Sequence, residues 1–127
     1  YWGKDPVSNS SGDAGEEYTA DYLHRHGFGI VKRNFHSRFG EIDIIAQNGR
    51  YLAFVEVKTR ERGSFLYPLE AITLSKQKKI ILTACLYLQS HPTTLQPRFD
   101  AAAVTAENGV PVSVSYFANA FSCRGFF

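Results

Sequence analysis

The sequence lacks a long apolar run, a secretory signal pattern and cysteines at metal-ligand spacing. No apolar run in its 127 residues approaches the roughly 20 residues that a bilayer-spanning helix needs. The N-terminus lacks the basic and then apolar pattern of a secretory signal, so we expect a cytoplasmic protein with no membrane partner. Cysteine is scarce: Cys85 and Cys123 match no metal-ligand spacing. We predict that they form no disulfide and that Cys85 is a buried small hydrophobic residue.

Net charge is also small. It is +2 at pH 7, which is too little to indicate nucleic-acid binding by itself. The basic residues are grouped, however, at positions 32–38, 58–62 and 76–79, whereas acidic residues gather at 13–21 and 41–43. The sequence contains no helix-turn-helix or zinc-finger pattern. A nucleic acid would therefore be recognised by its shape or backbone rather than by its base sequence.

One domain is the expected organisation of a chain of this length. Residues 1–11 mix glycine, proline, serine and asparagine without any period, and we expect a disordered arm or a remnant of an expression vector there. Residues 12–121 would form the domain, and residues 122–127 would be a tail.

Periodicity and turn residues predict two helices and five strands. Asp13 can cap a helix that runs to about His26, and Gly27 suits the position after its end. Asn48-Gly49 is typical of a type I′ turn, in which both residues have positive φ. The other predicted elements are strands at 28–36, 40–47 and 51–58, a basic loop at 59–68, a helix at 76–90 capped by Ser75, and strands at 98–106 and 111–118.

The pattern of apolar residues predicts how these elements pack. Residues 51–58 are nearly all apolar, as expected of a central strand that is covered on both faces. In the second helix, the predicted inward-facing residues are Ile81, Ala84, Cys85 and Leu88. The order α-β-β-β-α-β-β therefore predicts an α/β fold with a mixed β-sheet flanked by helices.

The predicted hairpin brings charged residues together. Asp43 lies on its first strand, and Glu56 and Lys58 lie on its second. Partner residues of a hairpin face each other, and residues two apart on a strand share a face. The two carboxylates and the amine can therefore converge, hold a divalent metal and activate a water against a phosphodiester. A surface salt bridge of little energetic value is the alternative, although an apolar central strand tolerates isolated charges poorly.

Motifs spread along the chain resemble those of the YraN family of small bacterial proteins. The matching segments are, in order, Gly15-Glu16, Gly40-Glu41-Ile42-Asp43, Phe54 to Arg60, Lys76-Gln77 and Arg98-Phe99-Asp100. The resemblance covers about residues 12–121. That family is similar to archaeal Holliday-junction resolvases and to the wider restriction-endonuclease-like superfamily, whose hallmark is an acidic residue followed on the next strand by (Asp/Glu)-x-Lys. Asp43 and Glu56-Val57-Lys58 match that hallmark.

The resemblance implies a restriction-endonuclease-like fold and a metal-dependent nuclease site. Asp43 and Glu56 would each give an oxygen to Mg²⁺ or Mn²⁺, with the Val57 carbonyl as a third ligand. Lys58 would orient the attacking water or stabilise the phosphorane. Glu16 matches an additional helical glutamate of the resolvases and would bind a second metal or position the water. Three further residues are weaker candidates or have no assigned role: Glu41, Gln77 and Asp100.

Basic residues near this site are the expected contacts with nucleic acid. Arg60 and Arg62 lie in the predicted loop directly after the catalytic strand, where they could grip a DNA backbone. Lys76, Lys78 and Lys79 would either contact phosphates from the start of the second helix or simply form a solvated helix face.

The leading prediction is a metal-dependent endonuclease that hydrolyses phosphodiester bonds in DNA. The resemblance to the resolvases implies that its substrates are branched or damaged DNA. By the same analogy, a homodimer would cut two strands symmetrically. Two other functions stay open: a catalytically silent nucleic-acid-binding module, and a protein-interaction domain of a repair or translation assembly. The complete set of Asp43, Glu56 and Lys58 favours the enzyme, since an idle site has no physical reason to keep mutually repelling carboxylates.

Overall fold

A five-stranded sheet and two helices make up the part of the chain that the computed structural model describes, residues 10–64 and 72–124. The elements are α1 Ser10–Arg25, β1 Gly29–His36, β2 Glu41–Gln47, β3 Tyr51–Glu61, α2 Leu74–Ser90, β4 Gln96–Glu107 and β5 Val110–Phe121. Their order and the mixed α/β architecture confirm the fold predicted from the sequence. The first nine residues of the predicted arm lie outside the described residues, and its last two belong to α1.

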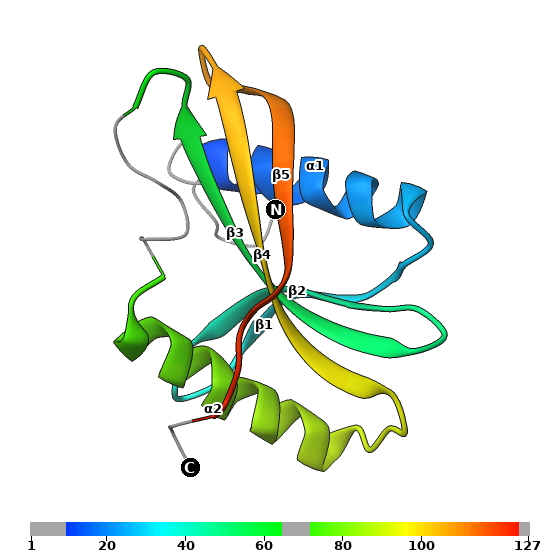
Figure 1. Ribbon diagram of the computed structural model, residues 1–127. Coiled ribbons are helices and arrows are strands. Elements are labelled where there is room, and N and C mark those ends of the chain that lie inside the picture. Colours follow the sequence, from blue (N-terminus) through cyan, green and yellow to red (C-terminus); the bar gives the residue numbers. More distant parts are fainter. Residues whose placement is uncertain (1–9, 65–71, 125–127) are drawn as a thin grey trace.

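The strands lie in the order β1-β2-β3-β4-β5. Three antiparallel strands, β1 to β3, are followed by the antiparallel hairpin of β4 and β5, and β3 pairs with β4 in parallel. Parallel neighbours need a crossover connection, and α2 supplies it. In Figure 1 the upper half of β3 runs alongside β4 and β5, whereas the left-hand ends of β1 and β2 turn away from it.

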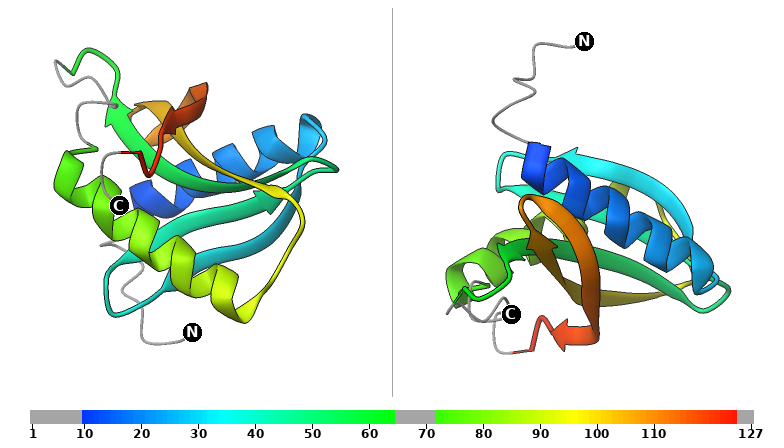
Figure 2. Two further views of the ribbon diagram at one scale, coloured as in Figure 1. Left: turned by 60° about the horizontal axis from the view of Figure 1, so that its bottom comes forward. Right: turned by 90° about the horizontal axis from the view of Figure 1, so that it is seen from above.

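One helix covers each face of the sheet (Figure 2). Ile80 and Tyr87 of α2 pack in one apolar cluster with Phe54, and Leu23 of α1 packs in another with Val55. Phe54 and Val55 are adjacent on β3 and face opposite helices because side chains alternate along a strand. The prediction of a central strand covered on both faces is therefore confirmed. Burying each such side chain stabilises the fold by about 1.5–3 kcal/mol.

The β2–β3 hairpin is present, but the predicted type I′ turn at Asn48-Gly49 is wrong. Among the described residues, the adjacent pair with positive φ is Asn108 (53°) and Gly109 (79°), in the β4–β5 hairpin, and neither Asn48 nor Gly49 has it. The Asn48 side chain accepts hydrogen bonds from the backbone N–H groups of Arg50 and Tyr51, at 2.8 and 2.7 Å. A turn held by its own asparagine side chain thus replaces the expected backbone geometry.

Other predicted boundaries shift by a few residues. β3 continues to Glu61, so Arg60 lies on a strand and not in a loop, because this end of β3 pairs in parallel with β4. α2 begins at Leu74, and its N-cap is Thr73, which accepts a hydrogen bond from Lys76 N at 3.2 Å, rather than Ser75. The predicted burial of Cys85 is also wrong: it is an exposed free thiol. Residues 65–68 of the predicted basic loop lie outside the described residues.

Candidate functional site

The candidate site lies where β2 and β3 stop pairing. Their last paired residues are Ile44 and Val55. One step further along, Asp43 and Glu56 stand on the two separating strands. Oδ2 of Asp43 accepts a hydrogen bond from the backbone N–H of Val57 at 2.8 Å, so a carboxylate takes the place of a backbone partner at the mouth of the fork.

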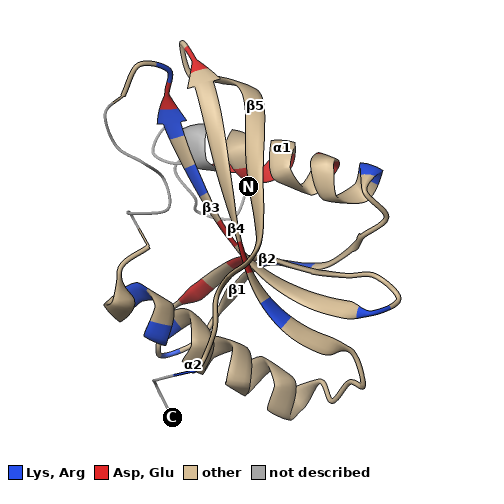
Figure 3. Ribbon diagram, in the orientation of Figure 1, with Lys and Arg blue, Asp and Glu red and all other residues tan. Residues whose placement is uncertain are grey.

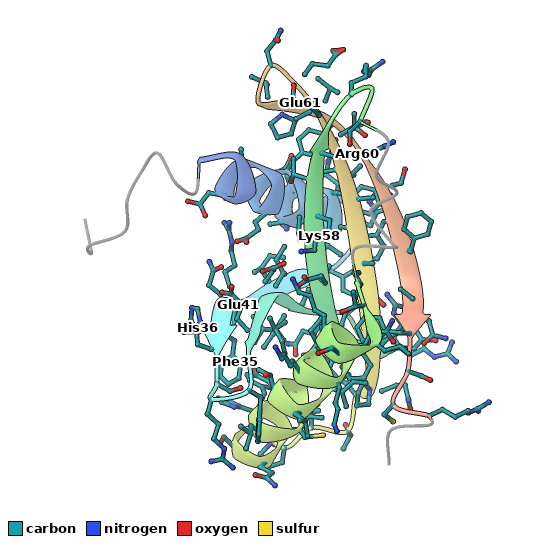
Figure 4. The ribbon with its side chains drawn as sticks, turned by 90° about the vertical axis from the view of Figure 1, so that its left-hand side faces the viewer. Phe35, His36, Glu41, Lys58, Arg60 and Glu61 are labelled. Carbon is teal, nitrogen blue, oxygen red and sulfur yellow. The ribbon has the colours of Figure 1, made fainter. Side chains whose placement is uncertain are left out.

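This fork is one wall of a cavity of about 350 Å³. The residues that line it come from α1, β2, β3 and α2, and they are Glu16, Glu41, Asp43, Glu56, Val57, Lys58, Thr59 and Lys76. All the catalytic and metal-binding residues proposed from the sequence are therefore brought together, although they span residues 16 to 58. Figure 4 shows Glu41 on β2 and Lys58 on β3, on the side of the molecule that faces the viewer.

Acidic side chains dominate the cavity. Four carboxylates and two lysines line it, and Figure 3 shows the acidic positions where β2 and β3 diverge, with basic positions at the start of α2 and further along β3. Asp43 is only 9% exposed and Glu56 only 3%. Burial first, and the nearby charge of Glu56 second, raise the pKa of Asp43 from 3.8 to about 8. Two carboxylates are thus held together at an electrostatic cost that a cation would relieve.

Two lysines share Glu56. Nζ of Lys76 lies 2.6 Å from Oε2 of Glu56, and Nζ of Lys58 lies 3.5 Å from the same oxygen. Burial and the neighbouring Lys76 lower the pKa of Lys58, although Glu56 opposes this. Burial also disfavours the charged form of Lys76, but its hydrogen bonds to Glu56 and Lys58 outweigh this, so the pKa of Lys76 is raised. Lys58 is the amine of the pair that loses its proton more readily.

Glu16 reaches the cavity because α1 packs unusually close to β3. A Cβ on Gly15 would overlap Oγ1 of Thr59, so the close approach requires glycine at position 15. The side chain of Glu16 is mostly buried, its Oε1 has no hydrogen-bond partner, and Nη2 of Arg33 lies 3.6 Å away. Burial raises the pKa of Glu16, and Arg33 partly offsets this. Oε1 of Glu16 is therefore held by an ion pair with Arg33, and the Glu16 side chain lines the acidic cavity as a candidate ligand or water-holding group.

The donor set fits a hard divalent cation. Within residues 10–64 and 72–124, no group of three or more His, Cys, Asp and Glu side chains is arranged to hold a metal ion. Mg²⁺ does not require such a group, since it keeps several waters and binds proteins through one or two carboxylates. Asp43 and Glu56 could supply those carboxylates, Val57 could add a backbone carbonyl, and Glu16 lines the same cavity. All of these donors are oxygens, which suits Mg²⁺ or Mn²⁺.

The five residues predicted to contact nucleic acid lie at different places in the structure. Lys76 lines the site cavity, and Lys79 lines an adjoining one. Arg60 shares the face of Lys58 on β3 and donates a hydrogen bond to the carbonyl of Ser64. Arg62 forms an ion pair with a carboxylate of the β4–β5 hairpin, at 3.0 Å.

Lys78 lies on the exposed surface of α2 and does not line either cavity. The five residues thus do not form one patch.

Two of the undecided residues have structural contacts elsewhere. Gln77 donates a hydrogen bond to the carbonyl of Ile72 at 3.1 Å. Asp100 is fully buried and accepts hydrogen bonds from Arg98, from the hydroxyl of Tyr116 and from the backbone N–H of Asn119. This network ties β4 to β5 and lies outside the site cavity. Arg98 and Asp100 are two residues apart on one strand, so the spacing could have indicated that their side chains share a face.

From the sequence, Lys76 was expected either to contact a nucleic-acid phosphate or to lie on a solvated helix face. Its place beside Glu56 depends on how α2 meets the sheet, which no local pattern reveals. The match of Lys76-Gln77 to a known family was the one signal that pointed to this position.

The fold and the acidic fork are consistent with the restriction-endonuclease-like class of proteins. The chain belongs to the uncharacterised protein family UPF0102, whose family model matches residues 15–104. This confirms the resemblance to the YraN family.

Curated relatives resemble the chain over most of its length. A UPF0102 protein of Syntrophotalea carbinolica is 44% identical over 117 residues, which cover 91% of this chain and 94% of the relative. One of Chloroflexus aurantiacus is 43% identical over 100 residues, with 77% and 81% covered. One of Dictyoglomus thermophilum is 40% identical over 112 residues, with 87% and 95% covered. In the described part of the chain, neither α1 nor α2 could span a bilayer.

Proposed function

We propose that the protein is a Mg²⁺- or Mn²⁺-dependent endonuclease that hydrolyses phosphodiester bonds in DNA. The observation that carries the proposal is the pair of buried carboxylates, Asp43 and Glu56, at the mouth of the β2–β3 fork with Lys58 beside them. A stable fold has no need for two nearly buried acids side by side, because the charge of Glu56 adds to the cost of ionising Asp43. A metal-binding function gives a physical reason for them.

The residues have distinct tasks in this proposal. Asp43, Glu56 and the carbonyl of Val57 would hold the divalent ion, which would supply positive charge for the developing phosphorane and a more acidic water. The Val57 N–H holds Oδ2 of Asp43 and so fixes the orientation of this carboxylate. Lys58, beside Glu56, would orient the attacking water or stabilise the phosphorane. Glu16, which lines the same cavity, would hold that water or a second ion through its carboxylate.

The shape and charge of the cavity indicate the class of substrate. It is an open acidic hollow next to lysines rather than a closed pocket for a single base, and this favours recognition of a phosphate backbone. The likeness to resolvases makes branched or damaged DNA the first substrate to test, and a homodimer the assembly to test with it.

Binding without cleavage is the competing function. It is favoured by the 2.6 Å contact between Lys76 and Glu56, which neutralises one carboxylate without any metal. A protein-interaction role has no comparable observation in its favour.

Cleavage of labelled four-way, flap, single-stranded and linear DNA tests the proposal. The wild type should cut at least one substrate with Mg²⁺ or Mn²⁺ and none in chelator. Glu56→Gln should be inactive, whereas Glu17→Gln, an exposed carboxylate on α1 outside the cavity, should cut normally. Metal-dependent binding to one substrate without cutting would support the silent module. Cutting by Glu56→Gln at the wild-type rate would exclude this site as the source of the activity.

A further inference from the structure

Lys76 contacts the carboxylate of Glu56, which is one of the two proposed metal ligands. It comes from the first turn of α2, whereas Asp43 and Glu56 lie on β2 and β3. Its Nζ is the nearer of the two lysine nitrogens to Glu56, at 2.6 Å against 3.5 Å for Lys58. Because Glu56 is almost out of reach of water, this ammonium is its main counter-charge. A cation that binds Glu56 must compete with it.

The side chain of Lys76 borders a second cavity into which its ammonium group can move. Its side chain is 39% exposed, and a lysine ammonium sits on a flexible four-carbon stem. It lines not only the site cavity but also a second cavity of about 290 Å³, which shares Glu41 with the first. The remaining walls of the second cavity are formed by Gly40, Thr73, Ser75, Lys79 and Ile80. Moving from one cavity to the other requires rotation of one side chain and no change in α2.

The second cavity suits a phosphate. Lys79 follows Lys76 by three residues and so lies on the same side of the helix. Both ammonium groups would border the second cavity once Lys76 has left Glu56, together with the hydroxyl of Ser75. Two lysines and a hydroxyl are common ligands for a backbone phosphate.

We propose that Lys76 is a positioning residue that exchanges between two partners. Without metal it neutralises Glu56. When a divalent ion binds, Lys76 is displaced into the second cavity, where it contacts a phosphate of the nucleic acid. This inference rests on the proposed metal-dependent nuclease. It adds that metal binding and DNA binding are coupled, so that each increases the affinity of the protein for the other ligand.

The consequence is measurable without any cleavage. The ion has to break the contact between Lys76 and Glu56, so wild-type metal affinity is reduced by that competition. A nucleic-acid phosphate restores part of the metal affinity because it gives the displaced ammonium of Lys76 a new partner. Removing the charge of Lys76 should therefore tighten metal binding and weaken its coupling to DNA.

Isothermal titration of the full chain with Mn²⁺, in the absence of DNA, tests this. Lys76→Met keeps the stem and removes the charge, and it should bind Mn²⁺ about tenfold tighter than the wild type or better, equal to about 1.4 kcal/mol. Lys78→Met is the matched control on the same helix, since Lys78 is exposed and lines neither cavity. It should keep the wild-type metal affinity.

A second titration measures the coupling to DNA. With Ca²⁺ in place of the catalytic ion, fluorescence anisotropy of a labelled duplex should show that the ion increases the DNA affinity of the wild type. The increase should be several-fold smaller for Lys76→Met. An equal increase in the two proteins would contradict the exchange.

Lys76→Arg keeps the test decisive if Lys76→Met does not fold, as judged by circular dichroism. The arginine retains the competing charge, so this variant should bind Mn²⁺ no more tightly than the wild type. Tighter binding by Lys76→Arg would overturn the inference. Unchanged or weaker binding by a folded Lys76→Met would also overturn it and leave the metal site itself intact. Absence of Mn²⁺ binding in every variant and in the wild type would overturn the proposed function together with the inference.

Discussion

Oδ2 of Asp43 accepts a hydrogen bond from the backbone N–H of Val57 at 2.8 Å, one step beyond the last paired residues of β2 and β3. A side chain thus completes the backbone hydrogen bonding at the point where the two strands part. The same carboxylate is buried beside Glu56 in the site cavity. The hydrogen bond therefore fixes the position of a proposed metal ligand relative to the two strands.

The stability of the metal-free protein should fall as the pH rises from about 4 to 8. The folded-state pKa of Asp43 is raised from 3.8 to about 8, so between these values the folded protein binds more protons than the unfolded chain. The free energy of unfolding then decreases with pH. Urea denaturation between pH 5 and 8.5 in chelator measures this.

Asp43→Asn should remove most of that pH dependence. The asparagine oxygen can still accept the hydrogen bond from Val57, so we expect the variant to be more stable than the wild type by about 1–3 kcal/mol at pH 8. Asp21→Asn, an exposed residue of α1, is the control and should follow the wild-type curve. A wild-type stability that rises steadily over this pH range would contradict the raised pKa.

Mn²⁺ should stabilise the wild type and not the variants that lack a carboxylate ligand. Binding to the folded state alone adds about 2.7 kcal/mol when the free ion is at one hundred times its dissociation constant. Thermal melting with increasing Mn²⁺ should raise the Tm of the wild type, and chelator should reverse the increase. Glu56→Gln and Asp43→Asn should show little or no increase. Equal increases in all three proteins would place the binding elsewhere.

Lys58→Met should separate metal binding from catalysis. Lys58 lies beside Glu56 but supplies no oxygen ligand, so the variant should keep Mn²⁺ affinity within a few-fold and lose cleavage by about 100-fold or more. Titration calorimetry and a single-turnover cleavage assay measure the two properties on one preparation. Full cleavage activity in Lys58→Met would remove Lys58 from the mechanism.

Gly15→Ala should move α1 away from β3. Its Cβ would overlap Oγ1 of Thr59, and overpacking of this kind costs about 1–3 kcal/mol of stability. Adding Thr59→Ala removes the overlapping oxygen, which has no hydrogen-bond partner, and should restore most of the stability. Denaturation of the two single variants and the double variant gives the coupling. Additive losses would show that the close approach at Gly15 is not what limits the packing.

Neutralising Arg60 and Arg62 should weaken DNA binding and reduce its dependence on salt. Each lost phosphate contact lowers the slope of log affinity against log salt by about 0.9. Arg60→Gln/Arg62→Gln compared with Arg25→Gln, an exposed residue in the last turn of α1, gives the comparison. Arg62 already pairs with Glu107, so we expect the smaller share of the effect from it. A slope equal to that of the wild type would remove both arginines from the interface.

The element order and much of the site could be predicted from the sequence because they depend on local patterns. The apolar run of β3 fixed its central place, and the hairpin placed Asp43 opposite Glu56. The end of β3 was missed because its partner, β4, lies about 45 residues further along the chain, and a parallel partner leaves no local signal. The turn at Asn48 was misjudged because an asparagine side chain can hold a turn by itself, whatever residue follows.

The position of Lys76 shows a different limit. Its spacing from Lys78 and Lys79 is equally typical of a solvated helix face, and only the approach of α2 to the fork sets Lys76 apart from them. Glu16 was placed by family resemblance alone. The physical basis for its position, a glycine that lets α1 approach Thr59, became visible only in three dimensions.

The proposed metal site can be examined in a crystal grown in Mn²⁺, with diffraction data collected at the manganese absorption edge. We expect an anomalous peak between Asp43 and Glu56, within coordination distance of a carboxylate oxygen of each, with the ammonium of Lys76 withdrawn from Glu56. Saturating Mn²⁺ with no peak at this fork, or with a peak bound to other residues, would contradict it.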